Sequence, residues 1–192
     1  GVPEGILDLD APPADILRKI AKAKGANVNE LLVCILDRPR HEKIIASVRE
    51  AGARIALIQD GDVSAVMATA DPASGIDVYI GTGGAPEGVL AAAALQCTGG
   101  RMLGRLVFRN DDEKSRAAKW GIKDLGKIYT TDELAKPGNV MFAATGVTDG
   151  TMLKGVRRFP GGAVTHSLVM RSKSGTIRRI EATHNFTRKA GK

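Results

Sequence analysis

The chain has 192 residues, of which 43% are hydrophobic and 26% charged, the usual balance of a globular protein in water. That length allows one or two domains with a substantial core. No apolar run approaches the ~20 residues needed to cross a bilayer, and the polar N-terminus does not resemble a secretory signal, so we expect no membrane association. Cys34 and Cys97 lie inside apolar patterns, which predicts buried reduced thiols and a cytoplasmic location.

The net charge of +7 is distributed unevenly along the chain. Residues 150–192 hold ten Lys and Arg and one acidic residue, whereas residues 1–149 carry a small acidic excess. A basic segment of this kind can bind nucleic acid. Only Phe159 and Phe186 accompany it as aromatic residues, too few for a platform on which single strands stack. This composition argues against a nucleic-acid partner and favours a solvated face or a surface that meets an acidic subunit.

Helices and strands alternate along the first hundred residues. Periodic apolar residues predict helices over residues 10–24, 39–52, 63–70 and 86–96. Short continuous apolar runs predict strands over residues 31–36, 54–58 and 76–80. Because these strands are apolar throughout and are separated by helices, they indicate a mostly parallel sheet with helices on both faces.

The pattern changes beyond residue 100. We expect a strand over 103–108, a helix over 111–119 capped by Asn110 or Asp111, and a strand over 140–145. Strands over 163–171 and 176–183, joined by a glycine-containing loop, predict an antiparallel hairpin. The expected fold class is therefore α/β with an α+β end. Residues 1–150 would form the α/β layer and residues 151–192 a basic, strand-rich end packed on it, as one continuous unit.

The most informative motif is the turn over residues 81–88, Gly-Thr-Gly-Gly-Ala-Pro-Glu-Gly, between an apolar run and an Ala-rich helix. Backbone N–H groups and the Glu87 carboxylate meet there at a helix N-terminus, which suits a phosphate or a metal–phosphate pair. Pro86 stands where a dinucleotide fingerprint needs glycine. Glu87 could donate oxygen to a hard divalent ion such as Mg²⁺ or Mn²⁺. The alternative is a tight turn in which Glu87 only favours the helix dipole.

A second junction, Asp60-Gly61-Asp62, follows the strand predicted over residues 54–58. Two carboxylates around a glycine can bind sugar hydroxyls or a metal. The alternative is a solvated turn whose aspartate caps the next helix.

A third junction, Arg38-Pro39-Arg40, follows the strand predicted over residues 31–36. Forked guanidinium donors at a helix start suit a phosphate, and the alternative is a basic surface turn. We expect His41 to be a surface helix residue. Because all three polar turns follow apolar strands, they predict one site along the edge of a sheet. No nucleophile–base pair is evident, so a metal-activated water is the economical nucleophile for a phosphate ester.

These motifs, in their order and spacing, resemble the class II (GlpX-type) fructose-1,6-bisphosphatases. The stretches that carry the resemblance are residues 35–41, 58–63, 83–88, 143–150 and 175–180. It extends over essentially the whole chain and implies the layered α/β fold of the lithium-sensitive, metal-dependent sugar phosphatases. It also implies removal of the 1-phosphate of fructose 1,6-bisphosphate in gluconeogenesis and, in some autotrophs, action on sedoheptulose 1,7-bisphosphate.

The resemblance also assigns roles to the three turns. It implies that Arg38 and Arg40, with Pro39 between them, hold a substrate phosphate. It implies likewise that Asp60 and Asp62, with Gly61 between them, bind substrate hydroxyls and that Gly84 makes a backbone contact. Glu87 would ligate a catalytic divalent cation, Mn²⁺ or Mg²⁺. Members of the family form homo-oligomers, which suggests a dimer or tetramer.

Family members are longer at the N-terminus, and that part carries most of the metal-binding carboxylates and the water-activating threonine. One carboxylate cannot hold a two-metal site. We therefore expect this chain to be the C-terminal part of the enzyme, with no catalytic residue of its own and little or no phosphatase activity when isolated. The alternative is a non-catalytic module that binds a phosphosugar or a nucleotide.

Overall fold

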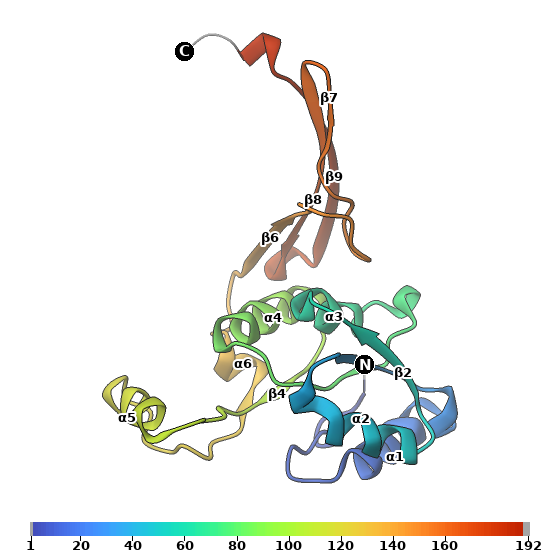
Figure 1. Cartoon of the computed structure of the whole chain (residues 1–192), viewed down its shortest axis with the longest axis vertical. Coiled ribbons are helices and arrows are strands. Elements are labelled where there is room, and N and C mark those ends of the chain that lie inside the picture. Colours follow the sequence, from blue (N-terminus) through green and yellow to red (C-terminus); the bar gives the residue numbers. More distant parts are fainter. Residues whose placement is uncertain (1, 190–192) are drawn as a thin grey trace.

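A computed structural model describes residues 2–189 of the chain. Its strands form three sheets: a parallel sheet of three strands, an antiparallel pair, and an antiparallel sheet of four strands. In Figure 1 helices lie on both faces of the parallel sheet, and the four-stranded sheet rises from this part toward the C-terminus. The expected α/β fold with an antiparallel end is confirmed.

The parallel sheet has the order β2-β1-β3, with β1 at Leu32–Leu36, β2 at Arg54–Ile58 and β3 at Val78–Tyr79. Central β1 is bonded on both edges, and four of its five residues are buried. Strand β3 is shorter than the predicted 76–80. The Asp77 carboxylate accepts the Leu32 N–H at 2.8 Å, so a side chain takes the place of a ladder carbonyl there.

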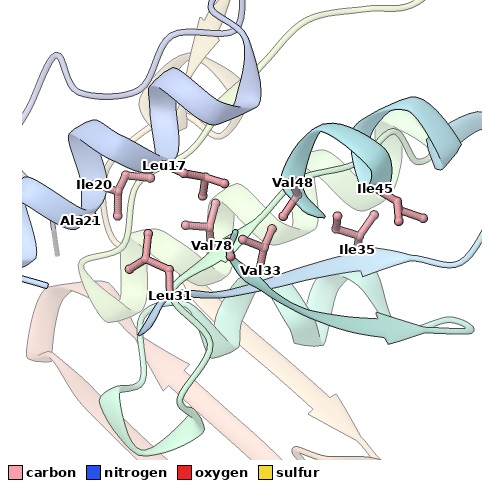
Figure 2. Packing of buried hydrophobic residues seen from close by; sticks show 10 residues of the cluster. Leu17, Ile20, Ala21, Leu31, Val33, Ile35, Ile45, Val48 and Val78 are labelled. Atoms are coloured by element: carbon pink, nitrogen blue, oxygen red, sulfur yellow. The ribbon is translucent and has the colours of Figure 1, made fainter. Parts of the chain in front are cut away.

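Helices α1 (Pro13–Lys24) and α2 (Glu42–Glu50) cover one face of this sheet. Figure 2 shows their apolar side chains meeting those of β1. The buried cluster includes Leu17, Ile20, Val33, Ile35, Ile45 and Val48. Both helices were predicted. The turn η2 (Pro39–His41) forms the first part of the predicted 39–52 helix, and Gly25 ends α1 in the left-handed conformation at φ 65°.

Helices α3 (Asp62–Ala68) and α4 (Ala85–Thr98) lie on the opposite face of the parallel sheet and separate it from the antiparallel sheet (Figure 1). A second buried cluster joins these helices to β8 of that sheet. It comprises Met67, Ala94, Cys97, Leu168 and Met170. Helix α4 is apolar on nearly every side, as expected for a helix placed between two layers. The chain is thus built in four layers: helices, sheet, helices, sheet.

The antiparallel sheet is centred on β8 (Gly162–Arg171). Strand β9 (Thr176–Asn185) pairs with β8 along its whole length, which confirms the predicted hairpin. On the other edge of β8 lie β6 (Met141–Thr145) and β7 (Arg157–Phe159). The turn η4 (Ser172–Ser174) closes the hairpin with Gly175 at φ 56°, a conformation that favours glycine.

The remaining elements lie between α4 and β6. Strands β4 (Leu103–Gly104) and β5 (Tyr129–Thr130) pair in antiparallel over two residues each, so β4 is much shorter than the predicted 103–108. Helix α5 spans Asp111–Lys119 as predicted, and the Asn110 side chain caps it by accepting the Glu113 N–H at 2.9 Å. The short α6 covers Thr131–Leu134. The other 3₁₀ turns are η1 (Val28–Glu30), η3 (Pro72–Ser74) and η5 (Thr187–Lys189).

Both cysteines are buried and free, as predicted. Burial raises the pKa of the Cys34 thiol and of the Cys97 thiol, so both stay protonated near neutral pH. Between residues 2 and 189, no helix is both long enough and apolar enough to span a membrane.

Candidate functional site

Three polar turns leave the parallel sheet at the carboxyl ends of its strands. The first turn, residues 38–41, follows β1; the second, residues 60–62, follows β2; the third, residues 81–84, follows β3. The carboxyl ends of parallel strands share one edge of the sheet, where α/β proteins bind their ligands.

The first and third turns meet at Thr82. Its carbonyl accepts a hydrogen bond from Arg40 Nε at 2.9 Å, and its N–H donates to His41 Nε2 at 2.9 Å. The other ring nitrogen of His41 lies 2.8 Å from the Leu36 carbonyl oxygen. The backbone of Thr82 is therefore held by two consecutive residues of the first turn.

His41 is fully buried, so the expectation of a surface helix residue is wrong. The turn at Pro39 directs the imidazole inward, where it pairs two backbone groups. A signal for this was present in the sequence. Counted along the helix, His41, Ile45 and Val48 are spaced by four and three residues, which places all three on the buried face.

Arg38 joins the first turn to the end of β2. One of its terminal nitrogens donates to the Asp37 carbonyl at 2.8 Å and the other to the carbonyl of Gln59. Both are thus used to hold the sheet edge. Asp60 and Gly61 are exposed just beyond, and Gly61 adopts the left-handed conformation at φ 82° before α3 begins.

The second and third turns meet through a carboxylate. A β-carbon added at Gly83 would lie 2.6 Å from Oδ2 of Asp62, and one added at Gly84 would overlap the carboxylate of Glu87. Two successive glycines therefore leave space that two carboxylate side chains occupy. The structure thus brings Arg40, Asp62 and Glu87 to one short stretch of backbone.

Tyr79, which the sequence analysis did not single out, lies next to Gly81 of the third turn. Burial, and secondly the negative charge of Asp62, raise the pKa of Tyr79 to about 12, and Arg40 opposes the shift. Its hydroxyl would be 3.0 Å from a β-carbon at Gly81. Because residues 79 and 81 point to the same side of an extended chain, this proximity follows from their spacing.

A groove of about 1010 Å³ opens beside the third turn. Asp62, Gly84 and Glu87 line it, together with Tyr79 and many apolar side chains. The lining does not include Arg38, Arg40, Asp60 or Gly61. Asp62 and Glu87 therefore face the groove, whereas Arg38 and Arg40 are not part of its lining.

The carboxylates of Asp62 and Glu87 are oxygen donors of the kind that Mg²⁺ and Mn²⁺ accept, and such ions take about six oxygen ligands. Across residues 2–189, no group of three or more His, Cys, Asp and Glu is placed to hold a metal ion. The donor set fits part of a metal site and requires further ligands from elsewhere.

Comparison with known sequences identifies the family of this chain. The sequence model of the family "Bacterial fructose-1,6-bisphosphatase, glpX-encoded" matches residues 2–184. The chain belongs to this family. The resemblance indicated by the motifs is thus confirmed.

Curated relatives from three bacteria are similar to nearly all of this GlpX-type chain. A class 2 fructose-1,6-bisphosphatase of Escherichia coli (strain K12) is 42% identical over 97% of the chain and 59% of its own length. Two proteins named D-fructose 1,6-bisphosphatase class 2/sedoheptulose 1,7-bisphosphatase are 40% identical in Trichodesmium erythraeum (strain IMS101) and 42% identical in Synechococcus sp. (strain JA-3-3Ab). Each is matched over 94% of the chain and 56% of the relative. The chain thus spans little more than half the length of the relatives it matches.

Proposed function

We propose that this chain supplies the substrate-binding part, and some of the metal ligands, of a class II fructose-1,6-bisphosphatase. The complete enzyme would hydrolyse the 1-phosphate of fructose 1,6-bisphosphate in gluconeogenesis. The observation that supports this most directly is the meeting of three polar turns around residues 82–87, in a chain of the GlpX-type family.

Arg40 is placed to hold a substrate phosphate. Its Nε is fixed by the Thr82 carbonyl at 2.9 Å and its side chain is exposed, so the guanidinium has a set direction at the sheet edge. A fixed guanidinium gives a phosphate charge-assisted hydrogen bonds at a small entropic cost. Arg38 and Pro39 complete this subsite, with Arg38 keeping the ends of β1 and β2 in position.

The second and third turns would bind the sugar and the metal. Asp60 and Asp62 would accept hydrogen bonds from substrate hydroxyls across Gly61, and the Gly84 N–H would donate at the N-terminus of α4. Glu87 would ligate the divalent cation, Mn²⁺ or Mg²⁺. Such an ion, when bound, activates a water and neutralises charge on the phosphate.

Because the described residues offer only part of a metal site, we expect the isolated chain to show little or no turnover. We propose further that residues 1–150 and 151–192 act as one continuous unit, since β6 pairs with β8. A homo-oligomer, dimer or tetramer, and a cytoplasmic location complete the proposal; the two free thiols suit a reducing compartment.

A second candidate is a non-catalytic module that binds a phosphosugar or a nucleotide. The incomplete set of metal ligands within residues 2–189 favours it. Binding of fructose 1,6-bisphosphate that is independent of divalent cations, with no preference over ATP, would support this alternative.

Calorimetric titration of the 192-residue chain with fructose 1,6-bisphosphate, with and without Mn²⁺, tests the proposal. We expect Arg40→Ala to weaken binding about tenfold or more, because a charge-assisted contact is lost. Arg49→Ala is the matched control, since Arg49 is exposed in the last turn of α2. Glu87→Gln should remove the Mn²⁺-dependent part of binding and leave the remainder.

Two results would contradict the proposal. One is binding that Arg40→Ala and Arg49→Ala weaken equally. The other is phosphatase turnover by the isolated chain at the ~1–10³ s⁻¹ of ordinary enzymes, which would require a complete metal site within it.

A further inference from the structure

His41 is one of two polar or charged residues that are buried among residues 2–189, and its exposed fraction is 0%. A buried imidazole needs partners for both ring nitrogens, because an unpaired buried polar group is costly. Both partners are backbone groups. Leu36 O lies 2.8 Å from Nδ1, and Thr82 N lies 2.9 Å from Nε2.

These partners determine the tautomer of the ring. A carbonyl oxygen only accepts hydrogen bonds and a backbone N–H only donates. The proton of His41 must therefore lie on Nδ1, which donates to Leu36, while Nε2 accepts from Thr82. This geometry requires the neutral imidazole, with one donor and one acceptor.

The same turn reaches Thr82 from its other side through Arg40 Nε. The N–H and the C=O of one residue are thus fixed by two neighbouring side chains. Gly81, just before it, packs closely: a β-carbon there would lie 3.4 Å from Cε1 of His41 and 3.0 Å from the Tyr79 hydroxyl. The glycine turn therefore rests on the end of β1 and on η2.

We propose that His41 is a positioning residue, whose neutral imidazole fixes the glycine turn of residues 81–84 to the end of β1 through the Thr82 N–H. The bond sets where the Gly84 N–H and the Glu87 carboxylate point, although His41 itself contacts neither substrate nor metal. The consequence for ligand binding rests on the function proposed above, whereas the attachment of the turn does not.

Two conservative variants separate the two hydrogen bonds. In His41→Gln, the side-chain amide oxygen sits as many bonds from the backbone as Nε2 and can still accept from Thr82. In His41→Asn, the shorter amide can reach only the Leu36 carbonyl. A role limited to filling the core predicts similar effects for both, whereas a role in positioning predicts that only the glutamine preserves the turn.

Amide hydrogen exchange at Thr82, referred to the amides of β1 in the same sample, measures the attachment. We expect exchange about tenfold faster in His41→Asn, the factor for one ordinary hydrogen bond, and close to wild type in His41→Gln. His184→Asn is the matched control, because His184 bonds the Thr165 hydroxyl on the antiparallel sheet. Equal acceleration in the two His41 variants would overturn the proposal.

The nitrogen-15 shifts of the wild-type imidazole give a test that survives a failure of the variants to fold. We expect a protonated Nδ1 and an unprotonated Nε2 at neutral pH, and the opposite tautomer would overturn the assignment. Weaker binding of fructose 1,6-bisphosphate by His41→Asn than by His41→Gln would extend the role to the site. If wild type does not bind this ligand, the proposed function fails while the exchange result at Thr82 still judges His41.

Discussion

The parallel sheet and the antiparallel sheet differ in how fully their strands are covered. Four of five residues of β1 are buried between two helical layers, whereas none of the ten residues of β9, all of them described, is buried. Ile177 and Ile180 of β9 are 49% and 43% exposed. In this sheet Leu168 and Met170 of β8 belong to a buried cluster, and Phe142 of β6 packs against it. The stability of this chain therefore resides mainly in its first layers, which also carry the candidate site.

Glycines in the two regions also differ in which atoms lie beside them. Beside Gly83 and Gly84 of the site lie the flexible ends of Asp62 and Glu87. Gly155, in the connection between β6 and β7, instead faces the backbone of Thr148 and Asp149. Substitutions in the site therefore displace functional groups, while substitutions in the connection strain the chain itself.

Truncating the core of the first layer should have the largest effect. Ile35→Ala removes a fully buried side chain that packs on α2, so we expect a loss of about 2–5 kcal/mol in the free energy of unfolding. Ile180→Ala on β9 is the matched control, with an expected loss below about 1 kcal/mol. Urea denaturation measures both. Comparable losses would show that the antiparallel sheet contributes as much stability as the first layers.

The next largest effect is expected from a comparison of two glycine substitutions, Gly155→Ala and Gly84→Ala. A β-carbon at Gly155 would lie 2.7 Å from the Thr148 carbonyl carbon, and this overlap should cost about 1–3 kcal/mol. Gly84 has φ −72°, which alanine adopts freely, so Gly84→Ala should change stability by less than about 0.5 kcal/mol. It should instead displace Glu87 and weaken Mn²⁺ binding. Wild-type stability of Gly155→Ala would contradict the expected backbone strain. Unchanged Mn²⁺ binding by Gly84→Ala would contradict the expected displacement of Glu87.

The smallest expected effect concerns Tyr79. Its pKa is raised to about 12 from the usual 10, so the folded state favours the neutral phenol. The stabilisation is present below pH 10 and is lost as the pH rises toward 12. Asp62→Asn removes one of the charges that raise it, so absorbance titration of the phenol should give a lower pKa in this variant. An unchanged pKa of Tyr79 in Asp62→Asn would show that the charge of Asp62 does not act on this phenol.

The sequence allowed most of the fold to be predicted, because apolar runs and helix caps are local signals. The hairpin of β8 and β9 and the Asn110 cap of α5 follow directly from such signals. Two other features could not be predicted from such local signals. Strand β3 is short because the Asp77 side chain substitutes for the ladder, and β7 is a three-residue strand exposed throughout.

The candidate site could be predicted as a set of turns but not as a set of contacts. The strand ends located Arg40, Asp62 and Glu87. They approach the backbone of residues 82–84, where Arg40 bonds the Thr82 carbonyl and Asp62 and Glu87 lie beside Gly83 and Gly84, and these backbone groups carry no signature in the sequence. For the same reason the two backbone hydrogen bonds of His41 could not be predicted from the sequence.

The central claim is that three turns from three strands form a single ligand site. The most direct measurement is an amide NMR titration of the chain with fructose 1,6-bisphosphate in the presence of Mg²⁺. The account predicts that the amides of Arg40, Asp62 and Gly84 shift together with one dissociation constant. Shifts confined to one turn, or to the basic residues of β7 and β9, would contradict it.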